Sequence, residues 1–368
     1  MRTFLFCLVN IVCLIASTPV SAHFYYNIST IPRSLIPSNS TWNHFNKYLG
    51  CRVGQNIKGL AKIKQYFQHF GYIDNSLSKN FTDEFDQLLF SALKTYQFNF
   101  NLNATGEFDT PTLQHMLKPR CGNPDIMNGT TNMNSGKSPR AEHTMAHFSF
   151  FEGQPRWPSS KTKLKYAFLP ENQLMDSVKA VFGRAFDKWS KVTPLTFKET
   201  ESYRLADIQI GFFVGEHEDG NPFDGPMKIL AHAFAPPTGF FHLDGDENWV
   251  VDGEILKEGM SRISVVDLES VAVHEIGHLL GLDHSSEKEA IMFPTLGAGV
   301  RKVDLSRDDI EGVQMLYGSN PNNNGSSTVY THSQKNDMSG YSTFGSLYPH
   351  WFSLISGFFL AFVLSILL

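Results

Sequence analysis

Residues 274–284 read His-Glu-Ile-Gly-His-Leu-Leu-Gly-Leu-Asp-His, which fits the pattern H-E-x-x-H-x-x-G-x-x-H. His274 and His278 are one helical turn apart, so their imidazoles leave the same helix face and can bind one zinc ion. Gly281 allows the helix to stop and the chain to turn, which brings His284 round as a third ligand. Three protein ligands leave one tetrahedral position open for water, and Glu275 can point towards that water. The motif therefore predicts a hydrolytic zinc centre with Glu275 as general base.

The segment Ala-Ile-Met-Phe-Pro at residues 290–294 resembles the Met-turn of the metzincin proteases, whose methionine, here Met292, lies beneath the zinc site. With the zinc motif, it makes the chain resemble the matrix metalloproteinases (matrixins), most closely the plant type, over residues 50–318. The plant-type features are Gly59-Leu60, Phe81-Thr82-Asp83, Thr95-Tyr96-Gln97 and the heptapeptide Pro-Arg-Cys-Gly-Asn-Pro-Asp at 119–125. The resemblance implies a secreted zinc-dependent endopeptidase made as a zymogen. It also implies a propeptide, a catalytic domain and a glycosylphosphatidylinositol anchor, but no hemopexin domain.

In that family the heptapeptide is the cysteine switch. A thiolate is a better zinc ligand than water, so Cys121 in the open position would keep the zymogen inactive until the propeptide is removed. The resemblance also implies that Arg120 and Asp125 pair to fix this loop. The alternative for Cys121 is a buried free thiol. Cys51 has no partner once Cys121 binds zinc, and its role stays open.

The resemblance implies two more metal sites. The ligands of a structural zinc would be His217, Asp219, His232 and His242. Those of a calcium ion would be the carboxylates of Asp224, Asp244 and Glu247 and the carbonyls of Gly225, Met227 and Ile229. The alternative for these acids is a solvated loop. The chain departs from the family at Pro-Thr-Gly-Phe-Phe (237–241), which lacks the usual ligands of a second calcium site and leaves Asp207 as its matching residue.

Substrate recognition is also predicted from the resemblance. Residues 230–234 resemble the edge strand to which matrixin substrates add as a further strand. Ser270 lies one helical turn before His274, where the family lines its S1′ pocket, and Pro294 and Leu296 would form the facing wall. Because serine is small, we predict a deep apolar pocket that accepts Leu, Met or an aromatic side chain at P1′.

Hydrophobic periodicity predicts helices over 53–70, from Thr82 onwards and from Thr110 onwards, which together form a small three-helix unit. Alternation predicts strands at 164–168 and 208–212, and helices follow at 174–190, 266–280 and 309–317, the last with Ser306 as N-cap. The predicted fold class is α+β. A metzincin-type catalytic domain, with a twisted and mostly parallel sheet and three helices, would follow a three-helix propeptide that resembles peptidoglycan-binding modules.

The composition narrows the function. Of the 368 residues, 42% are apolar and 18% charged, and the formal charge is −5 with no Lys/Arg-rich run, which argues against nucleic-acid binding. Four cysteines are too few for a disulfide scaffold. We expect a monomer that acts on proteins or peptides outside the cell.

Both ends of the chain resemble targeting signals. Residues 1–22 fit a secretory signal peptide, and the apolar C-terminus after a small-residue spacer fits a lipid-anchor signal, with a transmembrane tail as the alternative. Either would place the protein on the outer face of the plasma membrane. The predicted segments are a signal peptide (1–22), propeptide (23–146), catalytic domain (147–318), stalk (319–345) and anchor signal (346–368). Six N-glycosylation sequons begin at Asn27, Asn39, Asn80, Asn103, Asn128 and Asn324.

Two other functions are compatible with the sequence. The chain could be a zinc-holding pseudoenzyme that only binds, although Glu275 and all three histidines are present. Alternatively, residues 45–118 could be a cell-wall interaction module. Zinc-dependent proteolysis remains the prediction that accounts for most of the motifs.

Overall fold

The computed structural model describes residues 45–77, 80–129, 133, 147–225, 227–251 and 265–322. The predicted signal peptide, most of the stalk, the anchor signal and the sequons at Asn27, Asn39 and Asn324 lie outside these residues. No helix within the described ranges is long and apolar enough to cross a bilayer.

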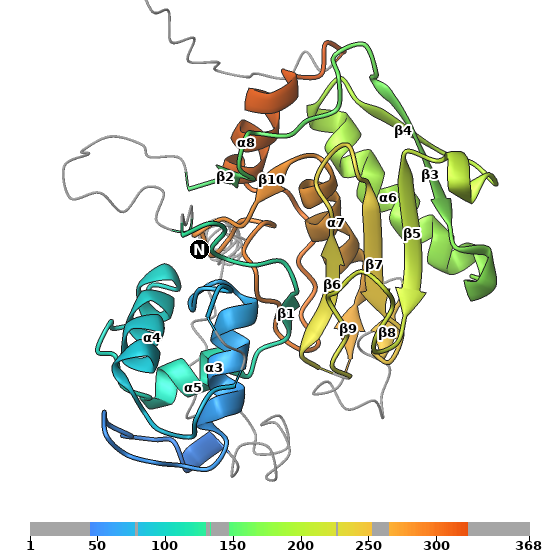
Figure 1. Cartoon of the computed structure of the whole chain (residues 1–368). Helices are drawn as coiled ribbons and strands as arrows, with labels where there is room; N and C mark the ends of the chain where they lie inside the picture. The colour runs from blue at the N-terminus through green and yellow to red at the C-terminus, as the bar shows by residue number, and fades with distance from the viewer. Residues whose placement is uncertain are drawn as a thin grey trace, which may run out of the picture. The chain divides into compact units, whose positions relative to one another are not determined.

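Six strands form the main sheet, in the order β1-β6-β7-β5-β3-β4 (Figure 1). Their bounds are Arg120–Cys121 (β1), Ile229–Ala233 (β6), Phe240–Asp244 (β7), Ile208–Phe213 (β5), Lys163–Phe168 (β3) and Thr196–Glu199 (β4). All neighbours are parallel except β6 and β7, which are antiparallel. The two strands predicted from alternation are confirmed as β3 and β5. Four further strands of two residues each form two separate pairs: β2 (Ser149–Phe150) with β10 (Leu282–Asp283), and β8 (Trp249–Val250) with β9 (Val266–Asp267).

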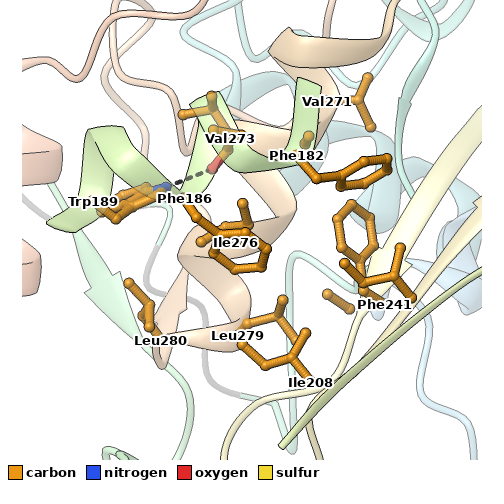
Figure 2. Packing of buried hydrophobic residues seen from close by; sticks show 14 of the residues in the cluster. Phe182, Phe186, Trp189, Ile208, Phe241, Val271, Val273, Ile276, Leu279 and Leu280 are labelled. Atoms are coloured by element: carbon orange, nitrogen blue, oxygen red, sulfur yellow. Dashed lines mark hydrogen bonds between the residues drawn. The ribbon is translucent and has the colours of Figure 1, made fainter. Parts of the chain in front are cut away.

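Two helices, α6 (Asp176–Val192) and α7 (Leu268–Leu279), pack against each other and against the sheet. One face of α6 is fully buried, including Phe182, Phe186 and Trp189, because its apolar residues recur at helical spacing. The Trp189 indole nitrogen donates a hydrogen bond to the carbonyl oxygen of Val273 at 3.0 Å, which ties α6 to α7 (Figure 2). The zinc-motif helix is therefore rigidly embedded in the core.

The helix ends differ from the sequence predictions by a few residues. α7 begins at Leu268 rather than 266, because Val266 and Asp267 form β9 and the Asp267 carboxylate caps the helix by accepting from the Ser270 N–H. The last helix, α8, runs over Arg307–Tyr317, and the predicted N-cap Ser306 is confirmed in a capping box with Asp309.

The described residues of the N-terminal unit include the three predicted helices: α3 (Leu60–His69), α4 (Gln87–Asn99) and α5 (Thr110–Met116). The predicted start of α3 at 53 is wrong, because the Asp83 carboxylate accepts from the N–H groups of Gly59 and Ala61 and fixes the first turn there. The helix expected from Thr82 onwards begins only at Gln87, whereas the helix expected from Thr110 onwards begins at that residue. Aspartates cap both helices, Asp86 for α4 and Asp109 for α5. The aromatic side chains of this unit form a second core that is separate from the sheet core.

The observed architecture is α+β, with a mostly parallel sheet, three helices around it and a helical N-terminal unit. The fold-class prediction is confirmed. Two 3₁₀ turns, Pro170–Asn172 and Tyr203–Leu205, complete the elements of the described chain.

Candidate active site

The zinc motif is built by the end of α7 and the turn that follows it. The whole helix is buried, and His274, Glu275 and His278 lie in its last two turns. The helix ends at Leu279, and Gly281 has a φ of 97°, with its Cα so close to the Pro155 carbonyl oxygen that a Cβ would lie 2.1 Å from it. Only glycine fits this turn, which leads through β10 to His284.

The three histidines converge with Cys121. One ligand atom of each residue lies within 4.8 Å of the others. The Nε2 atoms of His278 and His274 are 3.2 Å apart, and the Cys121 Sγ is 3.5 Å from the His278 Nε2. A tetrahedron with zinc–nitrogen bonds of about 2.0–2.1 Å and a zinc–sulfur bond of about 2.3 Å has edges of roughly 3.3–3.6 Å. The four residues therefore fit a tetrahedral zinc ion.

The Nδ1 atoms of the histidines face outward from the cluster. Those of His274 and His278 lie 2.6 and 2.8 Å from the carbonyl oxygens of Ile291 and Leu282. A carbonyl only accepts, so each Nδ1 carries the proton and each Nε2 keeps the lone pair that a metal needs. The Nδ1 of His284 lies 3.0 Å from the carboxylate of Asp125, and its Nε2 has no hydrogen-bond partner within the described part of the chain.

The electrostatics of this pocket also fit a cation. Burial lowers the pKa of His274 to about 3 and that of His278 well below its usual range, so both rings are neutral ligands. Burial also raises the pKa of Glu275 to about 8 and the pKa of the Cys121 thiol well above its usual range. Neither Glu275 oxygen has a hydrogen-bond partner among the described residues. A buried positive charge is what these acidic groups lack, and a metal ion would supply it.

Met292 packs under the zinc-motif helix. A Cβ on Gly277 would lie 2.2 Å from the Met292 Sδ, so the sulfur is in close contact with the helix between His274 and His278. Met292 is buried, and the N–H groups of Ile291 and Met292 donate to the Asp309 carboxylate at the start of α8. The structure thus places the predicted Met-turn residue directly against the helix that carries the ligands.

Strand β1 holds Cys121 in the groove between β6 and residues 294–296. On one side, the N–H groups of Arg120 and Gly122 donate to the carbonyls of Lys228 and Ala231, both at 2.8 Å. On the other, the Cys121 N–H donates to the Pro294 carbonyl at 2.9 Å. The heptapeptide therefore occupies the strand-pairing edge that the sequence analysis assigned to substrates.

A buried ion pair closes the heptapeptide. The Arg120 Nη2 lies 2.6 Å from Asp125 Oδ1, and both side chains are almost fully buried. Burial alone would raise the pKa of Asp125, but the Arg120 guanidinium outweighs it and holds that pKa well below its usual range. The guanidinium also lies over the Phe70 ring, 3.5 Å from its centre.

Asn123 is a functional residue that the sequence analysis missed. Its amide Nδ2 donates to the Ala233 carbonyl at 2.9 Å, and its Oδ1 accepts from the Ala233 N–H at 3.2 Å. The side chain thus pairs with β6 as a backbone would. No sequence pattern indicates this contact, because it joins residues 110 positions apart.

The second histidine cluster is also brought together. The ligand atoms of His217, Asp219, His232 and His242 lie within 4.8 Å of one another. One oxygen of Asp219 lies 3.0, 2.7 and 2.8 Å from ring nitrogens of His217, His232 and His242. Three imidazoles and one carboxylate in a closed set fit a structural zinc ion.

The predicted calcium ligands lie on the loop before β6 and the loop after β7. Asp244 and Glu247 are buried, and each has one carboxylate oxygen without a hydrogen-bond partner in the described chain. Burial raises the pKa of both acids, that of Glu247 to about 7. Two buried, incompletely satisfied acids fit a hard cation. Asp224 accepts from the Ile229 N–H at 3.1 Å, and Gly225 and Met227 have positive φ values of 82° and 71° in the same loop.

Asp207 does not resemble a calcium ligand in this structure. Its Oδ1 lies 2.5 Å from the Lys161 ammonium, and its Oδ2 accepts from the Lys165 N–H at 2.8 Å. A lysine already neutralises the carboxylate. The other ligands of a second calcium site are missing from 237–241, and the residues present do not fit that ion.

A partly open pocket lies beside His274 and Cys121. It is lined by Cys121, Leu230, Ser270, Val271, His274, Glu275, Ile291, Phe293, Pro294, Thr295, Leu296 and Lys302. The predicted pocket residues Ser270, Pro294 and Leu296 are all present, and apolar side chains form most of the wall. Lys302 was not predicted. Its ammonium donates to the carbonyls of Ala290 and Lys288, and burial lowers its pKa to about 8.

The chain was compared with known proteins. The Matrixin family model matches residues 156–318, and a peptidoglycan binding domain model matches residues 58–116. The chain is 55% identical to Metalloendoproteinase 5-MMP of Arabidopsis thaliana over 328 residues, which cover 88% of this chain and 89% of that protein. It is 52% identical to Metalloendoproteinase 2-MMP of the same plant, over 88% of both chains. It is 35% identical to human Matrilysin, over 74% of this chain and 93% of that protein. The chain therefore belongs to the matrixins, a family of zinc metalloendopeptidases that use zinc and calcium.

Proposed function

We propose that this chain is a secreted endopeptidase that is made latent, with His274, His278 and His284 as ligands of the catalytic zinc. Glu275 would be the general base, and Cys121 the ligand that keeps the precursor inactive. The observation that carries the proposal is the convergence of the Cys121 sulfur and the three histidines on one buried point, at the distances of a zinc tetrahedron.

When bound, zinc polarises the scissile carbonyl and makes a neighbouring water more acidic. Glu275 lies in the same buried pocket with both oxygens unpaired among the described residues, so it can take a proton from that water. The same carboxyl can then deliver the proton to the leaving amine. Strand β6 offers the backbone groups of Ala231 and Ala233 to a substrate strand once the heptapeptide leaves.

The proposed structural zinc and calcium ions would hold the loop between β5 and β6 against strands β6 and β7. The ligands would be those described above, His217, Asp219, His232 and His242 for zinc, and the acids led by Asp244 and Glu247 for calcium. Because β6 is the strand that pairs with the heptapeptide, these ions would fix the substrate groove rather than take part in the reaction.

We also propose that the protein acts outside the cell, on extracellular or cell-surface proteins, and is held at the membrane by a lipid anchor. The apolar termini in the sequence support this, as do the sequons at Asn80, Asn103 and Asn128, whose side chains are all exposed. The match of residues 58–116 to a peptidoglycan binding domain favours polysaccharide binding as a second function. However, the aromatic rings of this unit pack edge to face against one another inside its core, which supports a packing role.

The test is the Glu275→Gln variant, compared with the matched control Glu289→Gln on the surface. After removal of the N-terminal segment, we expect Glu275→Gln to retain its zinc by elemental analysis but to lose casein cleavage by a factor of at least about 10³. The control should cleave like the unchanged chain. Full activity in Glu275→Gln, or a processed chain without zinc, would refute the assignment.

A further inference from the structure

The hydrogen-bond acceptors of the three zinc-motif histidine rings come from different parts of the chain. The Nδ1 of His274 is held by the Ile291 carbonyl and that of His278 by the Leu282 carbonyl, at 2.6 and 2.8 Å. Both acceptors belong to the C-terminal half of the chain. The Nδ1 of His284 instead lies 3.0 Å from the carboxylate of Asp125, which is 159 positions away and part of the heptapeptide.

The other hydrogen bonds of His284 in the described structure hold its backbone and not its ring. Its N–H donates to the Asp283 carboxylate at 2.8 Å, and its carbonyl accepts from the Ser149 hydroxyl at 2.6 Å. Within the described residues the ring makes one hydrogen bond, which its Nδ1–H donates to the Asp125 carboxylate. The orientation of this imidazole therefore depends on a group outside the catalytic half.

Asp125 itself is fixed by the N-terminal unit. Its Oδ1 also lies 2.6 Å from the Arg120 Nη2, and its Oδ2 accepts from the Tyr72 hydroxyl at 2.8 Å. The Tyr72 oxygen accepts in turn from the side-chain amide of Asn99 at the end of α4. The carboxylate is thus ionised, fully buried and held in one position by groups that precede the connector.

We propose that Asp125 is a positioning residue for His284, and that the zinc site loses this support when the N-terminal segment is removed. The inference rests on the proposed zinc ligation and on the proposed removal of the segment. A carboxylate on the second ring nitrogen fixes the tautomer and angle of a ligand histidine and makes it more basic, and its loss typically costs 10–100-fold in metal affinity. The latent chain therefore holds catalytic zinc more tightly than the thiol alone explains.

The test separates the carboxylate from the sulfur. In the full chain with Glu275→Gln, which prevents self-cleavage, Cys121→Ala removes the sulfur but leaves Asp125 in place. Into this background we would introduce Asp125→Asn or the matched control Tyr72→Phe, which loosens the same carboxylate without touching its contact with His284. Zinc release to a coloured chelator is then timed, and the phase from the catalytic site is identified by its absence in His278→Ala.

We expect Asp125→Asn to speed release from the catalytic site by about 10–100-fold and Tyr72→Phe to change it by less than about threefold. Equal rates in all three chains, or equal acceleration by both substitutions, would overturn the inference. If the chain binds no zinc at this site at all, the proposed function fails instead, and elemental analysis distinguishes that case.

A second measurement does not depend on the folding of a variant. Imidazole ¹H–¹⁵N spectra of the zinc-loaded full chain should show a slowly exchanging Nδ1–H group for each of His274, His278 and His284. The His284 proton should lie downfield of the other two, because its acceptor is an anion rather than a carbonyl. A His284 ring that carries its proton on Nε2 would contradict the proposal directly.

Discussion

The buried ion pair of the heptapeptide should decide how completely the precursor is closed. Arg120 is 3% exposed, and the Asp125 side chain is 0% exposed, with 2.6 Å between the charged atoms. Removing one partner of such a pair leaves an uncompensated buried charge and costs about 3–5 kcal/mol. If Arg120→Gln destabilises by this amount the form in which the heptapeptide fills the groove, the fraction of molecules with an open groove rises between roughly a hundredfold and several thousandfold.

The assay is hydrolysis of a quenched fluorescent peptide by the intact full chain, with intactness checked by mass spectrometry at the end of each run. The matched control is Lys64→Gln, which breaks an ion pair between the buried Lys64 and the partly exposed Asp86 in the same N-terminal unit. We expect peptide hydrolysis by the intact Arg120→Gln chain to rise at least about a hundredfold above the unchanged chain, and the control to stay near the latent level.

A double-mutant cycle tests the reason. Asp125→Asn together with Arg120→Gln removes both charges, so no unpaired charge is left buried. The free-energy change of opening in the double variant should then be smaller than the sum of the changes in the two single variants, by at least about 1 kcal/mol. Additive effects, or an Arg120→Gln chain that stays latent, would refute the argument from buried charge.

Three further predictions concern the rest of the site. Burial raises the pKa of Glu247 to about 7 from its ordinary 4.5, so the calcium-free fold binds this proton more tightly than the unfolded chain. The calcium-free protein should therefore lose about 2 kcal/mol of its free energy of unfolding as the pH rises from 4.5 to 7. Added calcium, or the Glu247→Gln substitution, should remove that loss in calorimetry, and a stability that does not change with pH in the calcium-free protein would contradict the prediction. Asp207→Asn should leave calcium stoichiometry unchanged and cost less than about 1 kcal/mol, because its Lys161 partner is half exposed; a lost calcium equivalent would restore the second site. In a peptide library, Lys302→Met should lower the ratio of cleavage of peptides with Gln at P1′ to cleavage of peptides with Leu at P1′ by about fivefold. An unchanged ratio would show that the ammonium does not reach the P1′ side chain.

The features that sequence predicted best are local. The spacing of His274, His278 and His284 depends on one helix and one glycine turn, and both follow from neighbouring residues. The same holds for Ser306, whose capping partner Asp309 is three residues away. Local chemistry decided these elements, so the pattern was sufficient.

The features that sequence missed depend on partners far along the chain. The start of α3 is set by Asp83, whose carboxylate accepts a hydrogen bond from the N–H of Gly59, 24 residues away in the sequence. Asn123 and Lys302 acquire their roles only when β6 and the loop before α8 come together around the groove. Helical periodicity carries no information on such contacts, which require the tertiary structure.

The proposed latency would depend on the covalent connection of the heptapeptide as much as on its contacts. The thiol, the ion pair, the Asn123 amide and the backbone bonds of β1 all lie within residues 119–125. They close the groove because the segment is covalently attached, at an effective concentration on the order of millimolar. A cut between Asp125 and His147 removes none of these contacts but makes closure bimolecular. At nanomolar protein the segment is then diluted about a millionfold relative to its attached state, equivalent to roughly 8 kcal/mol. If the proposed latency holds, cleavage of the connector should release the site where the protein is dilute, and concentrated cleaved protein should stay inhibited.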